Sequence, residues 1–249
     1  MSTKIPKSHP RYESLMMREK LAKGFDEGFV HETGLIAHGR GEAFDYLLGE
    51  RTIPVADTAS KVAAALLLLA KHPVISVNGN VVALVAEDIV SLSKCVPAWI
   101  EVNLFHRTDD RISRLVSRME EAGGNAILGV HASARIDGLA HDRGWCEKEG
   151  IFSSDVVLVP LEDGDRCQAL RKMGKTVVTI DLNPLSRTAK TAQVTIVDNV
   201  VRAIPRIRFW VEQLKNESND VLQTIFDDWD NEQALEEVLS VICSRFQKD

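Results

Sequence analysis

The residues that could do chemistry in this sequence are concentrated where a hydrophobic run gives way to a polar turn. Residues 176–180 are rich in β-branched side chains, a composition typical of a strand buried on both faces. The turn that follows contributes the candidate residues Asp181, Leu182, Asn183, Arg187 and Thr188. A hydrogen-bonding carboxylate and a phosphate-gripping arginine at the carboxyl end of a strand favour a nucleotide site. A capped turn with an arginine left in solvent is the alternative.

A second candidate is the glycine-rich segment 33–42, which contains His38 and Arg40. Glycine on both sides of Arg40 would let the backbone approach a ligand closely. We expect a helix to start after this segment, near Ala43, so that its free N–H groups add to an anion site. The alternative is a tight turn between two helices. The sequence contains neither a Walker loop nor a GxGxxG motif.

Two asparagines mark a third candidate site. Residues 73–77 predict a strand, and Asn78, Gly79 and Asn80 stand between it and the next predicted helix. The order of strand, glycine turn and helix N-terminus is typical of ligand sites in open α/β sheets. An ordinary helix cap made by Asn80 explains the same pattern.

A cluster of carboxylates follows another predicted strand, residues 155–160. Glu162, Asp163 and Asp165 lie beside a glycine and could hold Mg²⁺ through oxygen ligands or bind an ammonium group. They could equally be acids that cap the next helix.

Arg18 lies on a predicted N-terminal helix, residues 10–23, next to its apolar stripe. If the packing of the stripe buries this arginine, it needs an acidic partner or an anionic ligand. The alternative is that Arg18 belongs to a basic face in solvent.

The elements that must position these residues alternate between strands and helices. Beyond those already described, we expect strands at residues 99–102, 126–130 and 193–197, and a long polar stretch at 131–150. Expected helices are a buried one at 54–71 capped near Asp57 or Thr58, one at 109–122, and one from about Pro205 to 215. Such alternation with uniformly apolar strands predicts an α/β fold with a mainly parallel sheet covered on both faces.

The pattern changes after residue 216. Two apolar stripes at helical spacing predict two amphipathic helices that pack on the core or on a second subunit. We therefore divide the chain into an α/β domain with N-terminal helices, residues 1–216, and a C-terminal helical extension, residues 217–249.

Bulk composition excludes several classes of protein. The net charge of −6 argues against nucleic acid as a partner. The four cysteines are widely spaced, which excludes a zinc cluster and a disulfide framework. The start of the chain has no apolar signal segment, and residues 62–70 are too few to span a bilayer. We expect a cytoplasmic protein with no membrane partner.

Several of these motifs together resemble the archaeal 4-phosphopantoate–β-alanine ligases, also called phosphopantothenate synthetases. The resemblance covers roughly residues 4–215 and rests on long motifs that recur in order. The matching segments are Ile5–Tyr12, Gly34–Ala43, Val77–Asn80, Glu101–Phe105, Val159–Arg166, Asp181–Thr188 and Val197–Val200.

The resemblance implies a Rossmann-like three-layer αβα fold, a homodimer and an ATP-dependent ligase of coenzyme A biosynthesis. In that reaction ATP activates the carboxylate of 4-phosphopantoate as an acyl-adenylate, and β-alanine attacks it to give 4′-phosphopantothenate, with AMP and pyrophosphate released. We expect Mg²⁺ to accompany ATP. The ATP site implied by the matching motifs consists of Arg18, Arg40, Asp181, Leu182, Asn183, Arg187, Thr188, Asn199 and Val200.

The remaining polar candidates are assigned to the other substrates. We expect His38, Asn78 and Asn80 to contact substrate, and Glu162, Asp163 and Asp165 to hold a metal or the β-alanine ammonium group. Two other functions are kept as alternatives: a kinase-like phosphotransferase or dehydrogenase on the same sheet, and a non-catalytic nucleotide sensor whose C-terminal helices bind a partner.

Overall fold

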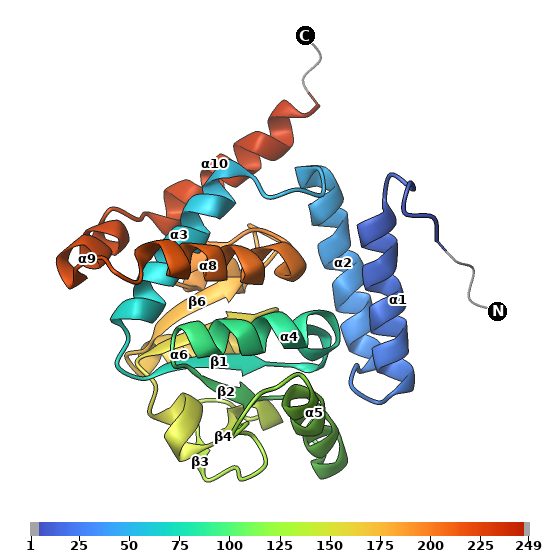
Figure 1. The fold of residues 1–249 in the computed structure, drawn as a ribbon, viewed down its shortest axis with the longest axis vertical. Coiled ribbons are helices and arrows are strands. Elements are labelled where there is room, and N and C mark those ends of the chain that lie inside the picture. The colour runs from blue at the N-terminus through green and yellow to red at the C-terminus, as the bar shows by residue number, and fades with distance from the viewer. Residues whose placement is uncertain (1–4, 247–249) are drawn as a thin grey trace.

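The computed structural model describes residues 5–246, which form an α/β fold (Figure 1). The α-helices are α1 (Tyr12–Asp26), α2 (Glu32–Leu48), α3 (Pro54–Leu69), α4 (Gly79–Cys95), α5 (Asp109–Glu121), α6 (Gly164–Lys172), α7 (Arg187–Thr191), α8 (Val200–Leu214), α9 (Asn219–Asp227) and α10 (Asn231–Ser244). The strands are β1 (Pro73–Val77), β2 (Trp99–Val102), β3 (Ala134–Arg135), β4 (Trp145–Cys146), β5 (Val156–Pro160), β6 (Thr176–Ile180) and β7 (Val194–Ile196).

The main sheet has five strands in the order β2-β1-β5-β6-β7, and every neighbouring pair is parallel. This is the order of a doubly wound sheet, in which the chain builds outward in both directions from a central pair. The direction of winding reverses between β1 and β5. Ligands bind at such a reversal, beyond the carboxyl ends of the strands.

The sheet is covered on both faces, so its residues alternate between two hydrophobic clusters. Val74, Val157 and Val177 are aligned across three strands and pack in one cluster with residues of α6. The next residues in each strand, Ile75, Leu158 and Val178, face the other cluster, which contains the residues of α3, α4 and α8. Because apolar side chains are buried on both faces, the strands read as continuous hydrophobic runs, and the predicted three-layer fold is confirmed.

The N-terminal helices α1 and α2 lie side by side at the edge toward which the strand arrows of β1 and β6 point (Figure 1). Asn80 at the start of α4 donates to the carbonyl oxygen of Gly34 in α2, at 2.8 Å. This contact is close because a Cβ atom on Gly34 would lie 2.5 Å from the Asn80 amide oxygen. The sequence thus brings α2 across the carboxyl ends of the strands.

Two expectations for the middle of the chain were wrong. Residues 126–130 do not form a strand, because only Leu128 bridges to Glu101 and the amides of Gly129 and His131 donate instead to the Glu147 carboxylate. The polar stretch 131–150 contains the short hairpin of β3 and β4, a 3-10 turn at Asp142–Gly144 and the start of a π-helical turn at Lys148–Phe152.

Two helix starts also differ from the expected ones. Helix α3 begins at Pro54 rather than near Asp57, because proline suits the first helical position, where no N–H partner is needed. Helix α8 begins at Val200, capped by Asn199, and carries Pro205 in its interior. The Asn199 cap fixes this start although Pro205 removes one hydrogen bond from the second turn.

The two predicted C-terminal helices are present as α9 and α10. Their buried residues Leu222, Leu235 and Val238 belong to the same hydrophobic cluster as α3, α4 and α8. The boundary proposed between residues 216 and 217 stays a prediction. None of the helices within residues 5–246 is both long and apolar enough to cross a membrane.

Candidate active site

A cavity of about 610 Å³ lies between α2 and the carboxyl ends of the strands. The first residues of α4, α6, α7 and α8 all line it: Gly79, Gly164, Arg187 and Val200. Each of these helices therefore directs N–H groups and the positive end of its dipole toward the same space. Such convergence favours a ligand with several negative charges.

Most residues predicted for the site line this one cavity. They are Arg40, Asp181, Leu182, Asn183, Arg187, Thr188, Asn199 and Val200 of the ATP set, and His38, Asn78, Asn80, Glu162 and Asp163 of the substrate set. The two that do not line it are Arg18 and Asp165. Arg18 is half-exposed on α1 and pairs with Glu42 at 2.9 Å, whereas Asp165 pairs with Arg187 at 2.8 Å.

Asn78 joins the two strands at which the sheet reverses. Its side-chain amide donates to the carbonyl oxygens of Pro160 and Leu161, at 3.3 and 3.1 Å, which continue β5. Its amide oxygen accepts from the Val81 N–H and caps α4. The cap is therefore Asn78 rather than Asn80, and both asparagines make structural bonds at the cavity wall.

The expectation that a loop carries Arg40 was wrong. Helix α2 begins at Glu32, capped by His31, so His38 and Arg40 lie inside a helix and not before one. The glycines serve close packing instead, since Gly34 faces Asn80 and Gly41 faces Leu182. The helix N-terminus expected near Ala43 is therefore absent from the site.

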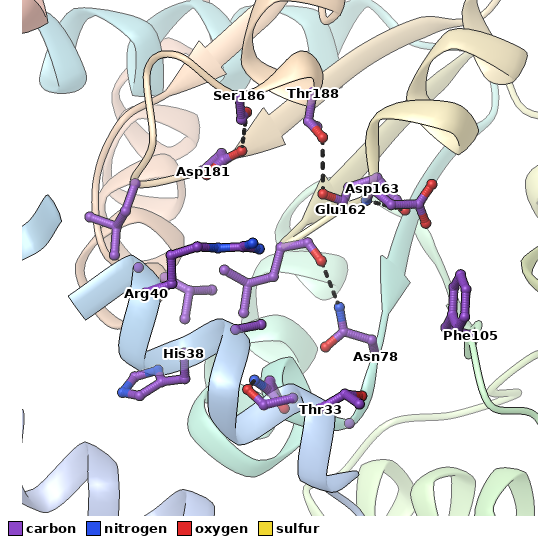
Figure 2. Close-up of a pocket in the computed structure, with 18 of the residues that line it drawn as sticks. Thr33, His38, Arg40, Asn78, Phe105, Glu162, Asp163, Asp181, Ser186 and Thr188 are labelled. Carbon is purple, nitrogen blue, oxygen red and sulfur yellow. Dashed lines mark hydrogen bonds between the residues drawn. The ribbon is translucent and has the colours of Figure 1, made fainter. Parts of the chain in front are cut away.

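His38 and Arg40 leave α2 in different directions, and Arg40 extends into the cavity below Asp181 (Figure 2). Arg40 is exposed and makes no hydrogen bond or ion pair with any of residues 5–246. The Nε2 atom of His38 is buried without a partner among those residues. Burial lowers the pKa of His38, which favours the neutral ring.

The turn after β6 is organised by its own side chains. Asp181 accepts from the backbone N–H of Asn183 at 2.9 Å and from the Ser186 hydroxyl, and Ser186 in turn caps α7 (Figure 2). Burial raises the pKa of Asp181, and the nearby Arg40 charge partly opposes this rise. The capped-turn interpretation is thus correct for the backbone, and the turn still presents Arg187 and Thr188 to the cavity.

The carboxylates after β5 each face an arginine. Glu162 is buried and forms ion pairs with Arg143 and Arg166, while Asp163 caps α6 and lies 3.3 Å from Arg143. Neighbouring arginines help hold the pKa of Asp163 below its usual value despite the opposing effect of burial. Within residues 5–246 no group of three or more histidine, cysteine or acidic side chains is arranged to hold a metal. The three acids do not form the expected metal cluster, because arginines already neutralise them.

A buried charge network holds Asn199 in place beneath the cavity. The Asp45 carboxylate on α2 accepts from the Asn199 amide at 2.9 Å and pairs with Arg202 at 2.5 Å. Arg202 also pairs with Asp198, at 2.6 Å. The network fixes the start of α8 relative to α2, which carries Arg40.

Sequence reasoning missed the residues at the other end of the cavity. His31, Phe105, His106, Arg111 and Arg143 line it but were not assigned to the site. Phe105 and His106 follow β2 directly, so their place at the carboxyl end of a strand was a usable signal. His31, Arg111 and Arg143 reach the cavity from a helix cap, a helix and an irregular segment, where no local pattern marks them.

Comparison with known proteins identifies the family. The model of the phosphopantothenate/pantothenate synthetase family matches residues 55–245. The chain belongs to this family. It is 51% identical over 246 residues to the 4-phosphopantoate–β-alanine ligase of Thermococcus onnurineus, covering 98% of this chain and 94% of that protein. It is 54% identical over 222 residues to the ligase of the same name from Methanospirillum hungatei, covering 89% and 90% of the two chains.

These matches make the chain an enzyme of the ligase class. They also extend through α9 and most of α10, so the C-terminal helices belong to the region shared with the family.

Proposed function

We propose that this protein condenses 4-phosphopantoate with β-alanine to give 4′-phosphopantothenate, a step of coenzyme A biosynthesis. ATP drives the reaction through an acyl-adenylate, and AMP and pyrophosphate are released. The observation that carries the proposal is the convergence of Arg40 and several helix N-termini on one cavity, in a chain half identical to ligases of that name.

The reaction must bring anions together. A carboxylate oxygen attacks the α-phosphorus of ATP, and the bond to the bridging oxygen of the β-phosphate breaks as pyrophosphate leaves. Helix N-termini and an arginine with no acidic partner among the described residues can offset the repulsion between carboxylate and triphosphate. The β-alanine nitrogen then attacks the acyl carbon, AMP leaves and the nitrogen loses a proton. Holding the reactants in line supplies much of the remaining rate.

The residue assignments follow the layout of the cavity. We assign ATP to the side formed by Arg40, the 181–183 turn, Arg187, Thr188, Asn199 and Val200. Arg18 keeps its predicted role in ATP binding, although in one copy of the chain it pairs with Glu42 outside the cavity. His38, Asn78, Asn80, Glu162, Asp163 and Asp165 remain candidates for contacts with the acid or with β-alanine.

Magnesium belongs to the proposal as a companion of ATP. The carboxylates at the cavity are paired with arginines, so the described residues offer no protein cage for it. Phosphate oxygens and water are ligands that Mg²⁺ accepts readily.

We further propose that two copies of the chain associate, in the cytoplasm, where ATP is supplied. Helix α2 exposes large apolar side chains to solvent: Ile36 is 75% and Tyr46 is 60% exposed. Burial of such residues against a second copy would remove apolar area from water. Light scattering of the full chain tests the dimer, and a monomeric mass at micromolar concentration would refute it.

The decisive experiment incubates the protein with ATP, 4-phosphopantoate and β-alanine and identifies the nucleotide product. AMP that requires both other substrates supports the ligase. ADP would instead indicate a kinase-like phosphotransferase, and ATP binding without turnover would indicate a sensor. Exchange of labelled pyrophosphate into ATP, dependent on 4-phosphopantoate and independent of β-alanine, tests the acyl-adenylate.

A further inference from the structure

The end of the cavity away from the 181–188 turn is lined by aromatic and cationic side chains. Phe105 and Thr33 lie at this end, whereas Asp181 and Ser186 lie at the other (Figure 2). The rings of His31 and His106 are stacked here with their centroids 4.0 Å apart. His31 comes from the cap of α2 and His106 from the loop after β2, so the stack closes this end of the cavity from two elements.

Arg111 of α5 lies beside this stack and lines the same cavity. Two of its N–H groups donate to backbone carbonyl oxygens, of His106 and of Phe29 at 3.0 Å, so the guanidinium is held in place. Of the five N–H groups of an arginine, three are then left over. No carboxylate among residues 5–246 forms an ion pair with it. Arg143 and Arg187, in contrast, pair with Glu162 and Asp165.

Positive charge at this end is therefore poorly compensated. Burial lowers the pKa of Arg111, which is the expected result for a half-buried cation without an acidic neighbour. Burial and the charges of His106 and Arg111 lower the pKa of His31, and only the exposed Glu32 acts against them. A bound dianion would relieve this repulsion and use the free N–H groups.

The two arginines of the cavity that lack an acidic partner among the described residues thus lie on different elements, Arg40 on α2 and Arg111 on α5. One is beside the turn assigned to ATP. We infer that the site formed by Arg111, His106 and His31 binds the phosphate group of the acid substrate. This inference rests on the proposed function for the identity of the acid.

The chemistry of the substrate agrees with such an arrangement. 4-Phosphopantoate carries its carboxylate and its phosphate at opposite ends of a four-carbon chain. The carboxylate must face the α-phosphate of ATP, so the phosphate must point to the far end of the cavity. The family name covers both phosphopantothenate and pantothenate synthetases. The Arg111 site selects the phosphorylated acid over pantoate in this chain.

The test compares the binding of 4-phosphopantoate and of pantoate by calorimetry, in the absence of β-alanine. The wild type should bind the phosphorylated acid more tightly. Arg111→Ala should weaken 4-phosphopantoate by about 10- to 100-fold, the effect of losing charge-assisted hydrogen bonds, and change pantoate less than threefold. Arg111→Lys, which keeps the charge, should restore part of the preference. ATP affinity should stay within threefold in both variants.

Arg114→Ala is the matched control, because Arg114 is on the same helix, pairs with Asp110 and does not line the cavity. It should leave the preference unchanged. Equal weakening of both acids by Arg111→Ala would assign Arg111 a purely structural role and overturn the inference, as would a larger loss of ATP affinity.

These results are separable from the proposed function. An Arg111-dependent preference for the phosphorylated acid would support the site even if the wild type formed no AMP. AMP formation by a wild type that binds both acids equally would support the ligase and overturn the site.

Discussion

Arg40→Ala tests the nucleotide assignment most directly. The side chain is exposed and has no hydrogen-bond partner among residues 5–246, so its removal should leave the free energy of unfolding within about 0.5 kcal/mol. If Arg40 grips the triphosphate, the variant loses a charge-assisted hydrogen bond of about 1.5–3 kcal/mol. The Kd for ATP should therefore rise by about 10- to 150-fold.

The loss of Arg40 should also change the neighbouring carboxylate. The Arg40 charge lowers the pKa of Asp181, which burial raises. In the variant the pKa of Asp181 should rise further, so that binding of ATP depends on pH over a range shifted upward from that of the wild type.

Calorimetric titration with a non-hydrolysable ATP analogue measures the affinity without turnover. Arg51→Ala is the control, because Arg51 is also exposed but does not line the cavity. A Kd for Arg40→Ala within twofold of the wild type would refute the assignment, since no other described contact of Arg40 could explain its position in the cavity.

Other variants test what supports the site. Asp45→Ala should destabilise the fold by about 3–5 kcal/mol, measured by urea unfolding, and raise the KM for ATP, because it breaks a buried ion pair and frees the Asn199 amide. Burial raises the pKa of Glu101 to about 7. Its contribution to stability is therefore present below its ordinary pKa and lost as pH rises through about 7, so the free energy of unfolding should fall by about 2 kcal/mol from pH 5.5 to 8. Gly34→Ala should lower kcat/KM more than tenfold, because its Cβ atom would lie 2.5 Å from Asn80 and push α2 off α4.

Each of these outcomes has its own counter-test. For the glycine, Gly39→Ala in the same helix is the control, since no atom lies within 4 Å of its added Cβ and helix propensity should make it neutral or slightly stabilising. Equal kinetics of the two alanine variants would contradict the packing argument. A pH profile of stability that Glu101→Gln leaves unchanged would show that Glu101 is not the titrating group, and native stability in Asp45→Ala would exclude its structural role.

Much of the α/β fold could be predicted from the sequence because its signals are local. The β-branched runs of β1, β5 and β6 mark doubly buried strands, and Thr108 and Asn199 cap helices at predicted positions. Prediction failed for residues 126–130, where the Glu147 carboxylate takes the amides that a strand partner would have used. A contact between residues that far apart leaves no trace in a short window of sequence.

The sequence by itself determined which polar groups follow each strand, and parallel strands place those groups at one edge. Asn78, Glu162, Asp181 and Asn199 are therefore neighbours by topology. Only the tertiary structure decided what these groups do. Asp181 and Asn78 are largely used to hold turns and strands together, and the glycines of α2 serve helix packing rather than a loop.

The tertiary structure also decided which cations are free to meet a ligand. Arg143 and Arg187 are neutralised by acids, whereas Arg40 and Arg111 have no acidic partner within the part of the chain described. A sequence records that an arginine is present, but its field depends on charges within a few ångströms, and those come from elements far apart along the chain.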